Sequence, residues 1–172
     1  MAQGKLLEQT LTAASGPEPG SLLYPVLIGT AAAGTLDILA AITVWTFRDV
    51  AAMRVLQSIA TGVMGKDAFA GGVGTAALGL LFHYAIMSVI VLLFVLASRR
   101  IDFLLRHPLL AGVLYGVVVF AVMTYVVVPL SASPLKPPPL PQVFEGLLIH
   151  MICVGLPISL TAHRFGRHLL AN

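Results

Sequence analysis

The sequence has 172 residues, of which 58% are hydrophobic and only 10% charged, and its mean hydropathy is +0.97. A water-soluble domain carries about 25% charged residues, so this composition excludes an ordinary soluble domain. The formal net charge is +3, but the basic residues stand in short clusters between apolar runs, without a nucleic-acid-binding motif. We therefore expect the lipid bilayer, and no nucleic acid, as the partner of this chain.

Residues 1–22 come first and lack the continuous apolar stretch of a signal peptide. We expect them to form a mobile N-terminal tail, and residues 166–172 to form a C-terminal tail. Residues 23–165 then make up one transmembrane domain.

Four apolar segments in this domain are long enough to cross a bilayer, which takes roughly 20 residues of α-helix. They span residues 24–47, 75–97, 109–128 and 143–162. The third is predicted to end before Pro129, and Pro157 is predicted to kink the fourth. The sequence thus predicts an all-α integral membrane protein, a bundle of four transmembrane helices.

The first two segments are joined by residues 48–74, which contain an amphipathic pattern over 50–64. We expect a helix there that lies at the membrane interface or folds back onto the bundle. Its apolar positions are Met53, Leu56, Ala60 and Val63, and its polar positions are Arg54, Gln57, Ser58 and Thr61. The proline-rich connection 129–141 is predicted to be extended and stiff, either as a rigid connector or as a docking strip.

Orientation follows from the ten Lys and Arg residues, six of which lie on the side of the two termini and the 98–107 loop. The short cluster Arg99, Arg100 and Arg106 dominates this bias. Because basic residues favour the cytoplasmic side, both termini are predicted to be cytoplasmic.

Small residues allow membrane helices to approach closely. Gly112 and Gly116 form a GxxxG pattern in the third segment, and Gly34, Gly79 and Gly146 lie on small-residue faces of the other three. These glycines are predicted to pack the bundle.

Three polar residues inside the apolar segments, Asp37, His83 and His150, share these small-residue faces. At 1.5 Å per residue, each lies roughly 10–15 Å from the end of its helix that is opposite the termini. They are therefore predicted to occupy one layer in the outer half of the membrane and to face the bundle interior.

This layer has three interpretations. Asp37, His83 and His150, with Glu145 near the start of the fourth helix, could bind a proton, a transition metal or a small solute. His83 and His150 could instead be the ligands of a b-type haem, with Gly79 and Gly146 leaving room for the flat ring. Each side chain could also simply hydrogen-bond a neighbouring helix. No nucleotide-binding loop, nucleophile elbow or paired acidic motif is present, so we do not expect an enzyme.

The second half of the chain resembles the YagU-like inner-membrane proteins of bacteria. The resemblance covers about residues 80–165 and lies in the histidine helix 81–86, the glycine-containing helix 110–116, the segments Val128–Leu130 and Leu140–Pro141, and Glu145 followed by His150. It implies a multi-pass protein of the bacterial inner membrane and draws attention to His83, Glu145 and His150. It implies no chemistry.

The leading hypothesis is a small membrane protein that binds or conducts a proton, metal ion or small solute at this polar layer. One alternative is a haem- or metal-binding redox subunit. The other is an accessory subunit that packs into a homo-oligomer or a larger membrane complex.

Overall fold

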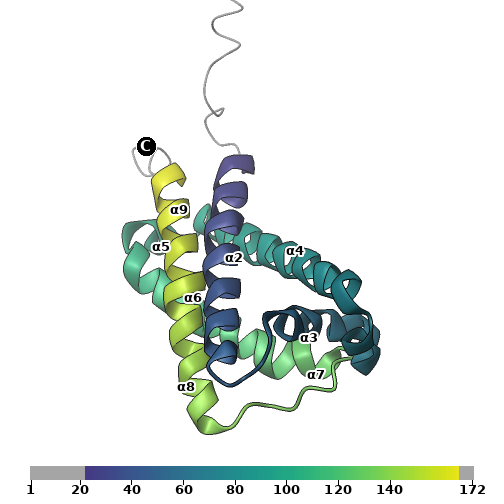
Figure 1. Ribbon diagram of the computed structural model, residues 1–172. Coiled ribbons are helices and arrows are strands. Elements are labelled where there is room, and N and C mark those ends of the chain that lie inside the picture. The colour runs from purple at the N-terminus through teal and green to yellow at the C-terminus, as the bar shows by residue number, and fades with distance from the viewer. Residues whose placement is uncertain (1–21, 167–172) are drawn as a thin grey trace, which may run out of the picture.

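The computed structural model describes residues 22–166, and every regular element in that range is helical (Figure 1). The tails predicted at residues 1–22 and 166–172 lie outside the described residues except for Leu22, which precedes α2, and Gly166, which is the last residue of α9. The elements, in chain order, are α2 (Leu23–Thr46), α3 (Ala52–Met64), the 3-10 helix η1 (Gly65–Ala70), α4 (Gly72–Ser98), α5 (Asp102–Arg106), α6 (Pro108–Val122), the π-helical segment η2 (Met123–Val127), α7 (Val128–Leu130), α8 (Leu140–Ile149), the π-helical segment η3 (His150–Gly155) and α9 (Leu156–Gly166).

Four helical stretches within this range are long and apolar enough to cross a membrane, which confirms the predicted all-α membrane bundle. They are Leu23–Thr46, Gly72–Ser98, Pro108–Leu130 and Leu140–Gly166. Large apolar side chains on all four are exposed, for example Leu27, Leu81, Leu109 and Phe144. Exposure on this scale is stable only where lipid surrounds the helices.

The third crossing continues through Pro129, before which the sequence predicted its end, and the fourth continues through Pro157. A helical proline lacks an N–H and clashes with the carbonyl four residues earlier. In each crossing a wider π-helical segment ends two residues before the proline, η2 before Pro129 and η3 before Pro157. The widened turns relieve this clash, so the third helix reaches Leu130 rather than 128.

Helix α3 is the predicted amphipathic helix, and it folds back onto α4 and α2. The face that packs inward differs from the predicted one. Gln57 and Thr61 are buried, whereas Met53 and Val63 are exposed. Burial is possible because Gln57 donates hydrogen bonds to the Gly72 carbonyl and the Thr75 hydroxyl, while Thr61 bonds the Ser58 carbonyl and the Ser133 hydroxyl.

The predicted packing glycines lie where helix backbones or rings approach closely. Side chains added at Gly112 and Gly116 would meet the backbone of η3 and α9, and one at Gly79 would meet the Leu56 carbonyl of α3. Gly34 faces the Tyr84 ring and Gly146 faces the Phe120 ring. Glycine is thus required for these approaches because any Cβ would fill the contact space.

The two ends of the bundle differ. Helix α2 begins and α9 ends at one end, here named the terminal end; the opposite end, with α3 and residues 131–139, is named the loop end (Figure 1). Toward the loop end α4 leans away from α2, and α3 lies between them (Figure 1). The even number of crossings places both described chain ends together.

Candidate functional site

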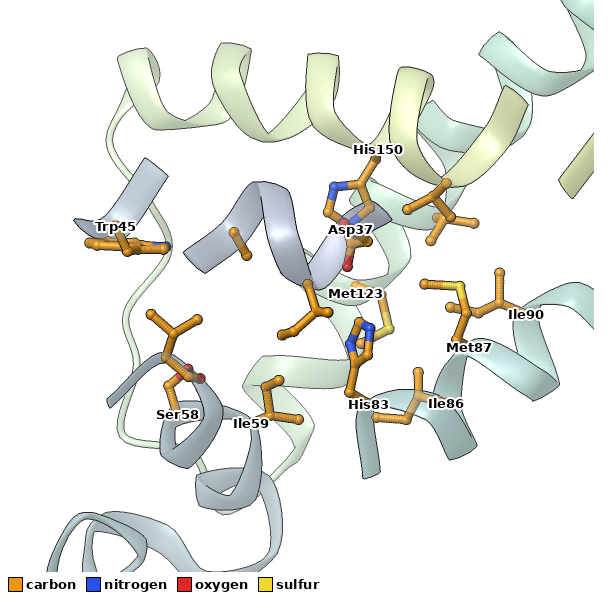
Figure 2. Close-up of a pocket in the computed structure, with 15 residues that line it drawn as sticks. Asp37, Trp45, Ser58, Ile59, His83, Ile86, Met87, Ile90, Met123 and His150 are labelled. Carbon is orange, nitrogen blue, oxygen red and sulfur yellow. Dashed lines mark hydrogen bonds between the residues drawn. The ribbon is translucent and has the colours of Figure 1, made fainter. Parts of the chain in front are cut away.

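A cavity of about 230 Å³ extends from the middle of the bundle toward the loop end, between α2, α3, α4, α6, η2 and η3. It is named the inner cavity, and Figure 2 shows Asp37, His83 and His150 pointing into it from three different helices. Trp45, Met87 and Met123 also line it. The structure thus brings together the three polar residues that the sequence placed in one layer.

His83 on α4 is buried, and its Nε2 lies 2.8 Å from the Gly34 carbonyl oxygen of α2. A carbonyl oxygen can only accept, so Nε2 carries the proton and donates it. No other described residue forms a hydrogen bond with Nδ1 of His83. The ring is therefore fixed by one nitrogen while the other can accept a proton.

His150 opens η3, and its Nδ1 donates to the carbonyl of Gly146, 2.9 Å away in the preceding turn. The ring also packs edge-on against Phe120, with centroids 5.3 Å apart. Among the described residues no hydrogen bond engages its Nε2. His150 thus repeats the arrangement of His83 with the two nitrogens exchanged.

Asp37 on α2 is half-buried and lies on the wall of the inner cavity. Within residues 22–166 no hydrogen bond or ion pair joins its carboxylate to another side chain or to the backbone. A carboxylate in an apolar bundle is costly without such a partner. Asp37 therefore presents a carboxylate without a described ion-pair partner to the inner cavity.

A second cavity, of about 190 Å³, adjoins the first and is named the vestibule. It shares Asp37, Ala41, Trp45 and His150 with the inner cavity. Its other walls come from the end of α2, from residue 138 of the proline-rich connection and from α8. Asp37 and His150 thus stand between a hollow near the loop surface and the deeper hollow that contains His83.

An ion pair borders the vestibule. Arg48 Nη2 lies 2.8 Å from Glu145 Oε2, and the two side chains are 37% and 34% exposed. The Arg48 guanidinium also lies over the Trp45 ring, 5.2 Å from its centroid. Glu145 therefore reaches the site region as the partner of Arg48, which joins α2 to α8 across the vestibule.

The metal and haem interpretations gain no geometric support. Within residues 22–166 no three His, Cys, Asp or Glu side chains come close enough together to hold a metal ion. The space that a haem would need beside the two glycines is filled, at Gly79 by the α3 backbone and at Gly146 by Phe120. His83 also directs Nε2, the nitrogen that commonly ligates metals, at Gly34.

Sequence reasoning did not single out Arg48 or Trp45 as site residues. Trp45 borders the inner cavity and the vestibule, and Arg48 pairs with a residue 97 positions away. The available signal was positional, since Arg48 lies just after the first crossing and Glu145 lies near the start of the fourth. Comparison with known protein families, with curated proteins and with solved structures gives no match for this chain.

Proposed function

We propose that the protein binds and passes protons across a membrane, with Asp37, His83 and His150 as the proton-binding groups. The observation that carries the proposal is that all three line one cavity inside a membrane bundle. Intramembrane carboxylates and imidazoles are the usual groups of proton relays. Histidine changes charge near neutral pH, so it can load and release a proton under ordinary conditions.

The hydrogen bonds of the two imidazoles suit this role. Each ring donates one N–H to a backbone carbonyl, Gly34 for His83 and Gly146 for His150. The second nitrogen of each can take up a proton without breaking that bond. Asp37, which has no ion-pair partner in the described range, would stabilise the imidazolium that forms.

The vestibule supplies the route from the loop end. A proton entering past Arg48 and Glu145 meets Asp37 and His150 first, and then His83 in the inner cavity. Beyond the inner cavity, Val91, Phe94 and Ile158 are fully buried apolar residues. Release toward the terminal end thus requires the helices to rearrange, and the widened turns η2 and η3 beside the cavity are where we expect that motion.

For the setting of this activity we propose the inner membrane of a bacterium, with both termini cytoplasmic. The location rests on the resemblance in residues 80–165, and the orientation rests on the Arg99–Arg106 cluster. Protons would then enter the vestibule from the outer face.

The test uses purified protein in liposomes that contain a pH-sensitive dye, with a potassium diffusion potential as the driving force. We expect wild-type protein to acidify the lumen faster than protein-free liposomes. His83→Gln keeps a donor near Nε2 for Gly34, and His150→Asn keeps one near Nδ1 for Gly146, while neither amide can bind a proton at neutral pH. Both variants should lose most of the proton flux.

His107→Gln is the matched control, because His107 is exposed and lines neither cavity. It should conduct like wild type. Wild-type flux equal to that of empty liposomes would overturn the proposed function and favour the accessory-subunit alternative. Normal flux in both His83→Gln and His150→Asn would overturn the assignment of the site.

A further inference from the structure

A third cavity, of about 260 Å³, lies at the loop end and takes no part in the proposed proton route. It lies between the end of α2, the start of α3, η1 and the proline-rich connection, and is named the Arg54 pocket. Its walls are mainly apolar, with Trp45, Val55, Phe69 and Leu135 among them, and Arg54 supplies the positive charge. An apolar hollow with one cation is the pattern of a site for an anionic amphiphile.

The Arg54 side chain is fixed by contacts with Phe69, but no described carboxylate balances its charge. Its Nη1 donates to the Phe69 carbonyl at 2.9 Å, and its guanidinium lies 5.4 Å from the centroid of the Phe69 ring. Within residues 22–166 no carboxylate pairs with it, whereas Arg48 is paired with Glu145. Four of its five N–H donors remain for an anion, and their planar arrangement matches a phosphate.

The pocket lies at the membrane boundary. Trp45, on its wall, is the second-last residue of the crossing helix α2. Next to it Phe47 is 85% exposed, and Leu135 on the pocket wall is also exposed. Aromatic and apolar side chains exposed at a helix end are stable at the level of lipid headgroups. We therefore expect the pocket to lie at the level of the lipid headgroups and the upper part of their chains.

We propose that the Arg54 pocket binds one anionic phospholipid. The headgroup phosphate lies on the Arg54 guanidinium, and the glycerol and first part of an acyl chain lie along Trp45, Phe69 and Leu135. A free phosphate would leave those apolar walls uncovered. A zwitterionic lipid carries its own cation next to the phosphate, so it gains less from Arg54.

The test is lipid titration of the purified, delipidated full-length protein in a mild detergent, followed by native mass spectrometry. The probes are dioleoylphosphatidylglycerol, dioleoylphosphatidylcholine and inorganic phosphate. Wild type should bind one phosphatidylglycerol about fivefold more tightly than phosphatidylcholine, the ratio that ~1 kcal/mol per arginine at a membrane surface produces. Inorganic phosphate at the same concentration should not displace it.

Arg54→Gln, which retains a donor for the Phe69 carbonyl, should bind both lipids equally. Lys66→Gln is the matched control, since Lys66 is an exposed cation on η1 that does not line the pocket; it should keep the wild-type ratio. Thermal unfolding of each variant in detergent checks that the fold is intact. The proposal is overturned if wild type binds phosphatidylglycerol and phosphatidylcholine with equal affinity, or if Arg54→Gln keeps the wild-type preference for phosphatidylglycerol. It is also overturned if Lys66→Gln loses that preference as Arg54→Gln does, or if inorganic phosphate displaces the lipid.

Discussion

The terminal end and the loop end of the bundle are built from the same four crossing helices, yet within residues 22–166 their interiors pack differently. At the terminal end Val91, Phe94 and Ile158 are almost completely buried in a single apolar core. The vestibule and the Arg54 pocket lie at the loop end, and the inner cavity extends toward it from the middle of the bundle. Because all four crossings are strongly apolar, hydrophobicity alone does not decide where a membrane bundle is open.

The difference lies in how the backbones meet. Gly112 and Gly155 bring α6 and the η3–α9 helix into direct backbone contact. Between α2 and α4, by contrast, the short helix α3 is inserted, and it carries Gln57 and Thr61 inward. The inner cavity and the Arg54 pocket both lie beside α3, against its residues Val55 and Ser58.

The largest expected effect on stability comes from adding a side chain at the backbone contact between α6 and the η3–α9 helix. A Cβ at Gly155 would collide with the Gly112 carbonyl oxygen and crowd the Gly116 amide, and neither backbone group can move independently of its helix. We expect Gly155→Ala to lower the free energy of unfolding by about 3 kcal/mol, at the upper end for an overpacked core. Unfolding in mixed micelles with increasing denaturing detergent measures this change.

Gly74→Ala is the control for this substitution, because no atom lies within 4 Å of a Cβ at Gly74. It should raise stability by about 0.5–1 kcal/mol, the gain from replacing a helical glycine with alanine. Equal stability of Gly155→Ala and wild type would show that the α6–η3 contact is looser than the structure indicates.

The fold was largely predictable because its signals are local. Length and apolarity predicted all four crossings, and periodicity predicted α3. The inward face of α3 was not predictable, since burial of Gln57 depends on the Gly72 carbonyl and Thr75, 15 and 18 residues away. The passage of helices through Pro129 and Pro157 also depends on π-helical segments that have no recognisable sequence pattern.

A smaller effect on the free energy of unfolding is expected at the loop end from Gly79→Ala. The new methyl group would collide with the Leu56 carbonyl of α3, but α3 is short and can move away from α4. We expect a loss of about 1–2 kcal/mol, less than for two long helices forced apart. Hydrogen exchange should become faster in residues 52–64 and stay unchanged in α9. Faster exchange spread over all four crossings would contradict the idea that the two ends respond separately.

For the site, the sequence predicted which polar side chains lie at one depth in the membrane. It did not predict their hydrogen-bond and ion-pair partners. Asp37, His83 and His150 stand out because charged and titratable residues are rare in the apolar segments. The carbonyl partners of the histidines, Gly34 and Gly146, are backbone groups, so residue identity gives no sign of them. The pairing of Arg48 with Glu145 joins residues 97 positions apart, and this distance left no local pattern.

The smallest expected effect on stability concerns the Arg48–Glu145 pair, which lies at the loop end and is about one-third exposed. A double-mutant cycle with Arg48→Gln and Glu145→Gln should give a coupling free energy of at most about 1 kcal/mol, because water screens exposed ion pairs. The same cycle on Asp102 and Arg106, a pair one helical turn apart that is 3.5 Å long and 61–70% exposed, should give about 0.3–0.5 kcal/mol. A larger coupling for the second pair would mean that Arg48 and Glu145 separate in solution. The vestibule would then be open at its outer edge, and the two ends of the bundle would differ even more than the structure indicates.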